Sequence, residues 1–344
     1  MKGKRGVGLT AGGLGVESAG MAETSGHKKK KKKRNVVLDY AGYVALRVLV
    51  VVLYLFPIEK NLRTARFLGR KLWRYYHRGR RRALGNLRAS FPEKSEEWIW
   101  QTGERSFEQM AMMAMDVIFT PKLVKKYNWR EYARFKGAER PKWMMKEGKG
   151  LLMVTGHYGN FEIMGYMMGL FGFDIYSVAR PLDNKFISRW LYGVRQREGQ
   201  RIVDKKGASR WMDEIVAKGA TLAFIADQDA GRKGIFVDFF GRKASTYKSI
   251  GLLAITNNMP ICVGYSRRVG DGFFFEMGLT RIIMPQEWAD KEDPLSWVTA
   301  EYTKAIEDFV REDPTQYWWL HRRWKHRPKE ELRELARIEA RSEI

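Results

Sequence analysis

Residues 156–162 (GHYGNFE) carry an imidazole and a carboxylate five positions apart, directly after a short apolar run. On one continuous helix this separation turns through about 140°, so the two side chains would diverge. They can meet only if His157 lies in a loop and Glu162 in the first turn of the following helix. The glycines at positions 156 and 159 permit such a loop.

A histidine paired with a carboxylate can activate a hydroxyl group. We expect Glu162 to accept a hydrogen bond from one ring nitrogen of His157 and so to fix its tautomer, while the other nitrogen takes a proton. A hydroxyl is a weak nucleophile until a base removes that proton during attack. The alternative is a structural histidine that caps a helix. The position between two glycines at the end of a strand favours catalysis.

Four short apolar runs predict strands, and the stretches between them have helical spacing. The runs are residues 151–155, 173–179, 221–226 and 260–265. Residues 60–135 read mainly as helix, and the methionines at 110, 112, 113 and 115 would line either the core or a lipid groove. Strands that alternate with helices indicate an α/β fold, with a mixed central sheet flanked by helices.

The composition restricts the partners. Lys and Arg number 63 against 39 Asp and Glu, which gives a net charge of +24 and attracts either nucleic acid or an anionic membrane. Twelve tryptophans and an apolar N-terminal run favour the membrane. The single cysteine, Cys262, excludes an intramolecular disulfide and a Cys-rich zinc site.

The chain divides by composition into four parts. Residues 1–35 predict a disordered tail that ends in a lysine-rich run, and residues 36–58 predict a membrane-anchoring helix. Residues 59–327 would form the catalytic domain, and residues 328–344 a charged C-terminal helix. Arg47 in the middle of the apolar run, and basic residues on both of its flanks, favour a shallow or re-entrant anchor over a true span.

The motif at 156–162 resembles the His-x4-Asp/Glu motif of the glycerolipid acyltransferases, and the wider pattern resembles the bacterial lipid A biosynthesis (lauroyl/myristoyl) acyltransferase family. Five ordered blocks over roughly residues 40–327 are far more specific than one His-x4-Glu pair. The four further blocks are residues 178–184 (VARPLDN), 226–231 (ADQDAG), 239–246 (FFGRKAST) and 314–325 (PTQYWWLHRRWK).

The resemblance implies transfer of an acyl chain from an acyl carrier protein thioester to a hydroxyl of a lipid A precursor. It implies no cofactor and no metal, and a catalytic domain on the cytoplasmic face of the bacterial inner membrane. One alternative is another lipid hydroxyl, on a phosphatidylinositol mannoside or a hydroxyacyl aminolipid. A basic nucleic-acid-binding protein is a remote alternative, because it leaves the five blocks unexplained.

The resemblance also implies roles for single residues. His157 would be the general base and Glu162 its partner. Arg180 follows a predicted strand, so it should lie at the same sheet edge as His157 and hold a substrate phosphate or the oxyanion. Further substrate-binding residues would be Asn160, Asn184, Asp227, Asp229, Arg322 and Arg323.

Several of these residues have a second interpretation. Asp227 and Asp229 could bind a metal, but two carboxylates without a further ligand make a poor cage, so we expect them to position their loop or to contact the acceptor sugar. The small residues around Gly241 could admit an acyl chain or form a plain turn. The tryptophans near the C-terminus could line a membrane interface or close the core, so Arg322 and Arg323 are the better anion ligands.

Overall fold

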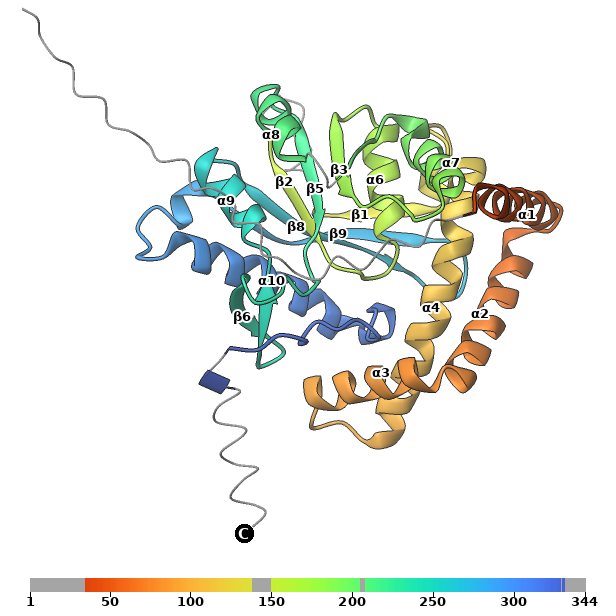
Figure 1. Cartoon of the computed structure of the whole chain (residues 1–344), viewed down its shortest axis with the longest axis horizontal. Coiled ribbons are helices and arrows are strands. Elements are labelled where there is room, and N and C mark those ends of the chain that lie inside the picture. Colours follow the sequence, from red (N-terminus) through yellow and green to blue (C-terminus); the bar gives the residue numbers. More distant parts are fainter. Residues whose placement is uncertain (1–34, 138–149, 205–207, 329, 332–344) are drawn as a thin grey trace, which may run out of the picture.

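The computed structural model describes residues 35–137, 150–204, 208–328 and 330–331 (Figure 1). The predicted tail up to residue 34, and the C-terminal helix beyond residue 331, lie outside the described residues. The described helices are α1 (Val36–Tyr54), α2 (Ile58–Tyr75), α3 (His77–Ser90), α4 (Glu96–Leu123), α6 (Phe161–Leu170), α7 (Lys185–Arg195), α8 (Ala208–Ala217), α9 (Lys248–Thr256) and α10 (Pro294–Glu312).

A seven-stranded mixed sheet forms the centre, in the order β1-β9-β8-β2-β5-β3-β4, which confirms the predicted α/β architecture. Strands β9 and β8 pair antiparallel, so β1 and β9 run opposite to the other five. The strands are β1 (Ala133–Lys136), β2 (Leu152–Thr155), β3 (Ile175–Ala179), β4 (Arg201–Asp204), β5 (Thr221–Ile225), β8 (Ile261–Arg268) and β9 (Phe275–Ile283), with β6 (Ile235–Phe239) and β7 (Arg242–Thr246) as a separate hairpin.

The four predicted strands are confirmed as β2, β3, β5 and β8. Their sequences are apolar runs because helices cover both faces of a central strand, so side chains on both faces are buried. All four residues of β2 are buried. The short strands β1 and β4 lie at the two edges of the sheet, and both carry exposed charged residues. An apolar run therefore does not mark them in the sequence.

Helices cover both faces of the sheet (Figure 1). On one face, Leu152 and Val154 of β2 share a core with Ile306 and Phe309 of α10. On the other, Met167 of α6 packs in a second core, which α4, α2 and β9 complete. The other face of β2 carries Met153, which packs in a third core with Cys262 of β8. The strand that leads into the 156–162 motif therefore has core contacts on both of its faces.

Helix α1 covers residues 36–54 of the predicted 36–58 anchor. It ends at Tyr54, and α2 begins at Ile58, because the intervening Pro57 has no N–H to donate. Asn61 closes the break by donating to the backbone carbonyls of Leu53 (3.0 Å) and Pro57 (3.1 Å). Helix α1 is long and apolar enough to cross a membrane, with a mean hydropathy of 2.1.

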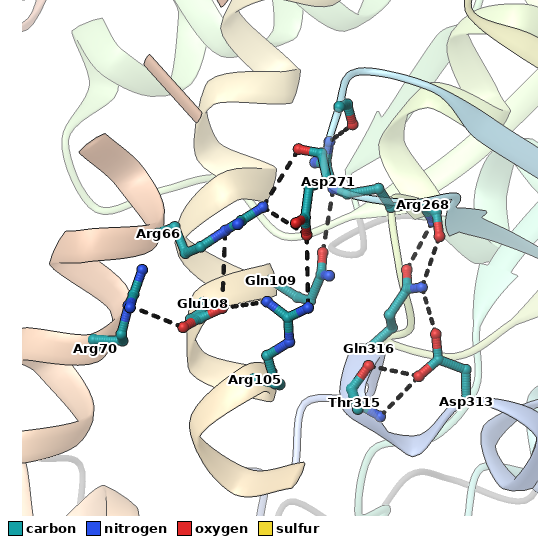
Figure 2. A network of polar contacts seen from close by, with 11 residues as sticks. Arg66, Arg70, Arg105, Glu108, Gln109, Arg268, Asp271, Asp313, Thr315 and Gln316 are labelled. Atoms are coloured by element: carbon teal, nitrogen blue, oxygen red, sulfur yellow. Dashed lines mark hydrogen bonds and ion pairs between the residues drawn. The ribbon is translucent and has the colours of Figure 1, made fainter. Parts of the chain in front are cut away.

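Helices α2 and α4 are joined by a network of arginines and carboxylates (Figure 2). The buried Glu108 of α4 receives Arg70 of α2 at 3.1 Å and Arg105 at 2.9 Å, and Arg66 lies 3.9 Å away. Arg66 also reaches Asp271, in the turn between β8 and β9, at 2.7 Å. A buried carboxylate needs cationic partners, so this network fixes α2, α4 and that turn relative to one another.

The same network continues to the C-terminal segment through Arg268 at the end of β8 (Figure 2). The Arg268 side chain forms an ion pair with Asp116 of α4, and burial raises the pKa of that carboxyl to about 6. Gln316 accepts from the Arg268 backbone N–H at 2.8 Å and donates to its carbonyl at 2.9 Å. The chain that leads into the 317–325 block is thereby held against the sheet.

Candidate active site

Three strands bring the predicted chemistry to one edge of the sheet. Strand β5 pairs in parallel with both β2 and β3, so the carboxyl ends of all three strands lie side by side. His157 follows β2, Arg180 follows β3, and Asp227 and Gln228 follow β5. Ligands of α/β proteins commonly bind at this edge.

His157 is held by Asp227. The ring Nδ1 lies 2.7 Å from Asp227 Oδ1, and the backbone N–H of His157 donates to Oδ2 at 2.8 Å. Burial raises the pKa of the Asp227 carboxyl, but the neighbouring His157 lowers it more, so it titrates well below its ordinary range. Asp227 is therefore ionised, which places the imidazole proton on Nδ1 and leaves Nε2 as an acceptor.

Aromatic rings and one amide enclose the imidazole. Trp318 and His321 lie with their ring centroids 5.3 and 4.4 Å from that of His157. The amide Nε2 of Gln228 lies 3.3 Å from the free Nε2 of His157 and can donate to it. The ring is thus fixed on three sides, and it lines a cleft.

Glu162 lies in the first turn of α6, as predicted, with His157 in the loop before it. The predicted hydrogen bond between the two is wrong. Arg195 of α7 donates to Glu162 through Nε at 2.7 Å and also through a terminal nitrogen, which makes a bidentate ion pair. The carboxylate that orients His157 is Asp227. Glu162 and Arg195 both line the cleft.

The loop between β2 and α6 depends on Gly159. Its φ is +52°, and a Cβ there would come within 2.0 Å of the Ser266 carbonyl oxygen. Its backbone N–H donates to Gln316 at 2.9 Å, and the Trp318 N–H donates to the His157 carbonyl at 3.1 Å. The C-terminal segment therefore positions the loop that carries His157.

The cleft has a volume of about 1150 Å³. One wall is a stripe of α4 at helical spacing, which includes Met110 and Met113. Met112 is fully buried in the core. The methionines of this helix are therefore divided between the core and the lining of the cleft. Trp190 of α7 and Leu252 of α9 also line the cleft.

Arg180 lies on the cleft wall, with an exposed side chain. Within the described ranges, it forms no hydrogen bond or ion pair. It is therefore available to an anionic ligand, and its predicted place at the same sheet edge as His157 is confirmed.

Four predicted substrate contacts are hydrogen-bonded within the protein instead. For Asn160 and Asn184 this corrects the prediction, whereas for Asp227 and Asp229 it supports the predicted alternative, the positioning of a loop. Asn160 is buried and accepts from the Ile163 N–H at 3.0 Å as the cap of α6. Asn184 caps α7 and donates to the Asp39 carbonyl of α1 at 2.7 Å. Asp229 lies 2.7 Å from Nδ1 of His326. Asp227 is buried behind His157.

Arg323 is also not an anion ligand. It is 1% exposed and donates to the Ser245 carbonyl at 2.5 Å and to the Thr246 hydroxyl at 2.6 Å. It therefore fixes the β6–β7 hairpin, whose tight turn includes Gly241 at φ +67°. The turn interpretation of that segment is correct. Arg322 is exposed and keeps its predicted availability.

The three C-terminal tryptophans have different places. Trp318 lines the cleft beside His157. Trp319 is 1% exposed in the core, and Trp324 stacks on Phe239 with ring centroids 5.6 Å apart. The core interpretation is therefore correct for two of the three.

His157, Asp227 and His321 bring possible metal-ligand atoms within 4.8 Å of one another. The 2.7 Å separation of His157 Nδ1 and Asp227 Oδ1 is that of a direct hydrogen bond and leaves no room for an ion between them. Burial, and then His157, lower the pKa of His321 to about 4, so this ring is neutral near pH 7.

Asp227 as the partner of His157, together with Gln228 and Arg195, was missed by sequence reasoning. Residues 226–231 were recognised, and they directly follow a predicted strand. The sequence alone does not show that this strand is the immediate neighbour of β2 in the sheet. That neighbourhood is the signal that could have paired Asp227 with His157.

Comparison with known proteins identifies the family that the chain resembles. Residues 28–326 match the family described as bacterial lipid A biosynthesis acyltransferase. The lipid A biosynthesis lauroyltransferase of Escherichia coli is 28% identical over 76% of this chain and 84% of its own length. A lipid A biosynthesis acyltransferase of Haemophilus influenzae is 29% identical over 75% and 83%, and the E. coli myristoyltransferase 27% over 78% and 82%.

Proposed function

The chain belongs to the bacterial lipid A biosynthesis acyltransferase family, and on that premise we propose that it transfers a fatty acyl chain from an acyl carrier protein thioester to a hydroxyl of a lipid A precursor. The observation that carries the chemistry is the imidazole of His157, which presents Nε2 to the cleft while Asp227 holds Nδ1 at 2.7 Å.

In the proposed reaction, His157 is the general base. Its Nε2 removes the proton from the acceptor hydroxyl as that oxygen attacks the thioester carbonyl. The ionised Asp227 stabilises the imidazolium that forms. The tetrahedral intermediate then collapses with cleavage of the C–S bond, and the imidazolium returns its proton to the departing thiolate. No covalent enzyme intermediate is required.

Arg180 supplies the positive charge in the proposed complex. Its unpaired guanidinium on the cleft wall fits a phosphate or carbohydrate-linked anion of the acceptor. An oxyanion stabiliser, by contrast, is held in place before the reaction. The exposed Arg180 side chain lacks such a support among the described residues, so phosphate binding is favoured.

Glu162 has a different role in this proposal. Its bidentate ion pair with Arg195 joins α6 to α7, and both residues line the cleft. Removal of the carboxylate would leave a half-buried guanidinium without its partner, which is costly. We therefore expect Glu162 to support the shape of the site, and its variants to lose activity by that route.

The donor and the membrane remain part of the proposal. Acyl carrier protein is acidic, and a net charge of +24 would favour its docking. Helix α1 would hold the enzyme at the bacterial inner membrane, since only 6% of its apolar window is buried in the protein. The proposed donor is acyl carrier protein, so the cleft would lie on the cytoplasmic face. Docking by charge predicts that the KM for the donor rises with ionic strength.

The test is a reconstitution of the full chain in vesicles with lauroyl and myristoyl acyl carrier protein. A lipid A precursor, a phosphatidylinositol mannoside and a hydroxyacyl aminolipid are offered in parallel, and products are identified by mass spectrometry. We expect acylation of the lipid A precursor, which His157→Ala abolishes. Acylation of only another acceptor would overturn the assignment of the substrate, and full activity of His157→Ala would overturn the mechanism.

A further inference from the structure

Helix α1 contacts two of the helices that line the cleft, α4 and α7, although it contributes no residue to the cleft itself. Its C-terminal end meets α4 and its N-terminal half meets α7, and Figure 1 shows α1 beside α7. We propose that α1 braces the cleft and that Asn184 is the positioning residue that couples it to the α7 wall. The proposal rests on the proposed function, because it concerns access of the lipid acceptor to that cleft.

The C-terminal end of α1 is fixed to α4. The hydroxyl of Tyr54 donates to the Ile118 carbonyl at 2.7 Å, and Lys122 Nζ donates to the Tyr54 carbonyl at 3.0 Å. The Tyr54 ring also packs edge-on against Phe119, with centroids 5.1 Å apart. Ile118 is itself a cleft-lining residue, so this end of α1 is attached directly to one wall.

The N-terminal half of α1 rests on the start of α7. The Asn184 side-chain amide donates to the Asp39 carbonyl at 2.7 Å. Phe186 packs between two tyrosines of α1, with ring centroids 5.3 Å from Tyr40 and 6.2 Å from Tyr43. The cleft lining includes Trp190, Leu191 and Arg195 of α7, so a displacement of α7 would move that part of the lining.

Few side chains of α1 are buried. Val50 is its single buried residue, and apolar side chains such as Val37 (75% exposed) and Leu38 (70%) face outward. Such a surface is stable in contact with lipid rather than with water. The bilayer that receives α1 would therefore also keep it in contact with α7.

The two polar atoms of Asn184 have separate functions, which makes the coupling testable. Its Oδ1 caps α7 by accepting from the N–H groups of Phe186 (3.0 Å) and Ile187 (3.1 Å), whereas its Nδ2 alone reaches α1. Asn184→Asp keeps a good cap but replaces the donor by an acceptor facing the Asp39 carbonyl. It loosens the contact with α1 without removing the cap.

A matched control is Asn128→Asp. Asn128 also accepts from a backbone N–H, that of Lys125 (2.7 Å), and donates to a backbone carbonyl, that of Leu123 (3.0 Å). It does so at the end of α4, away from the contact between α1 and α7. Both variants and the wild-type chain are compared in anionic vesicles, with the lipid A precursor as acceptor.

Two readouts are taken. We expect Asn184→Asp to raise the KM for the lipid acceptor about 3- to 10-fold, the equivalent of one hydrogen bond, with kcat within about twofold of wild type. We also expect faster amide hydrogen exchange along residues 185–195 in that variant. Asn128→Asp should match wild type in both respects.

Unchanged exchange along α7, an unchanged KM, or equal effects in Asn128→Asp would overturn the coupling. If the wild-type enzyme acylates no lipid offered to it, the proposed function fails. The exchange measurement then decides by itself whether α1 braces α7, because it requires no turnover.

Discussion

Asp227 binds His157 twice, through the backbone N–H at 2.8 Å and through the ring Nδ1 at 2.7 Å. One carboxylate therefore fixes the loop, the orientation of the ring and the tautomer. Glu162, the acidic residue of the sequence motif, is committed to Arg195 instead. The proposed site thus contains two carboxylates with different tasks, and this difference leads to separate predictions.

Replacement of Asp227 should act on the chemical step. We expect Asp227→Asn to lower kcat by about 10²- to 10⁴-fold, the usual contribution of general base catalysis, because the amide cannot stabilise an imidazolium or enforce the same tautomer. His157→Ala should cause a similar loss. Steady-state kinetics with circular dichroism would check both, and an Asp227→Asn enzyme with near wild-type kcat would rule out this role of Asp227.

Arg180 should act on binding of the acceptor. We expect Arg180→Ala to raise the KM for the lipid A precursor about tenfold or more, with a small change in kcat, because an anion contact made equally in ground and transition states changes KM alone. Arg180→Lys should recover part of the loss. A fall in kcat with KM unchanged would instead assign Arg180 to the oxyanion.

The adjacent arginines 322 and 323 should differ in stability. Arg323→Met removes two buried hydrogen bonds to the β6–β7 hairpin, so we expect a loss of about 2 to 4 kcal/mol in the free energy of unfolding. Arg322→Met changes an exposed side chain and should stay within about 0.5 kcal/mol of wild type. Urea unfolding measures both, and equal losses would refute the buried role of Arg323.

The sequence predicted the central strands, the mixed sheet and the placement of His157 and Glu162, because apolar runs and glycines act locally. It did not predict the partners of those two residues. Asp227 lies 70 positions from His157 and Arg195 lies 33 from Glu162, so their contacts depend on strand order and helix packing. Local patterns carry no information about either.

The family motifs also did not distinguish residues that contact a ligand from residues that support the fold. Asn160, Asn184 and Arg323 belong to recognised blocks, yet their polar atoms bind the backbone of this protein. A polar residue in a block of the family is equally compatible with a ligand contact and with a buried hydrogen bond. Burial decides between the two, and burial follows from the tertiary fold.

His321 should make stability depend on pH. Its pKa is lowered to about 4 in the folded chain, whereas an unfolded histidine titrates near about 6.5. Between these values the unfolded chain binds the extra proton, so the free energy of unfolding rises with pH across the window.

We therefore expect wild type to lose on the order of 2 to 3 kcal/mol relative to His321→Gln as the pH falls from about 6.5 to about 4. Urea unfolding of the two proteins at three pH values across the window measures the difference, and titrations common to both cancel. Stability curves that stay parallel would show that His321 is not desolvated as described.

The tautomer of His157 tests the central claim most directly. Ring ¹⁵N chemical shifts can be recorded on the chain labelled at its five histidines, with His157 assigned by substitution. We predict a neutral ring with its proton on Nδ1 in wild type and in Glu162→Gln, and loss of that pattern in Asp227→Asn. A wild-type pattern that survives Asp227→Asn but disappears in Glu162→Gln would contradict the account.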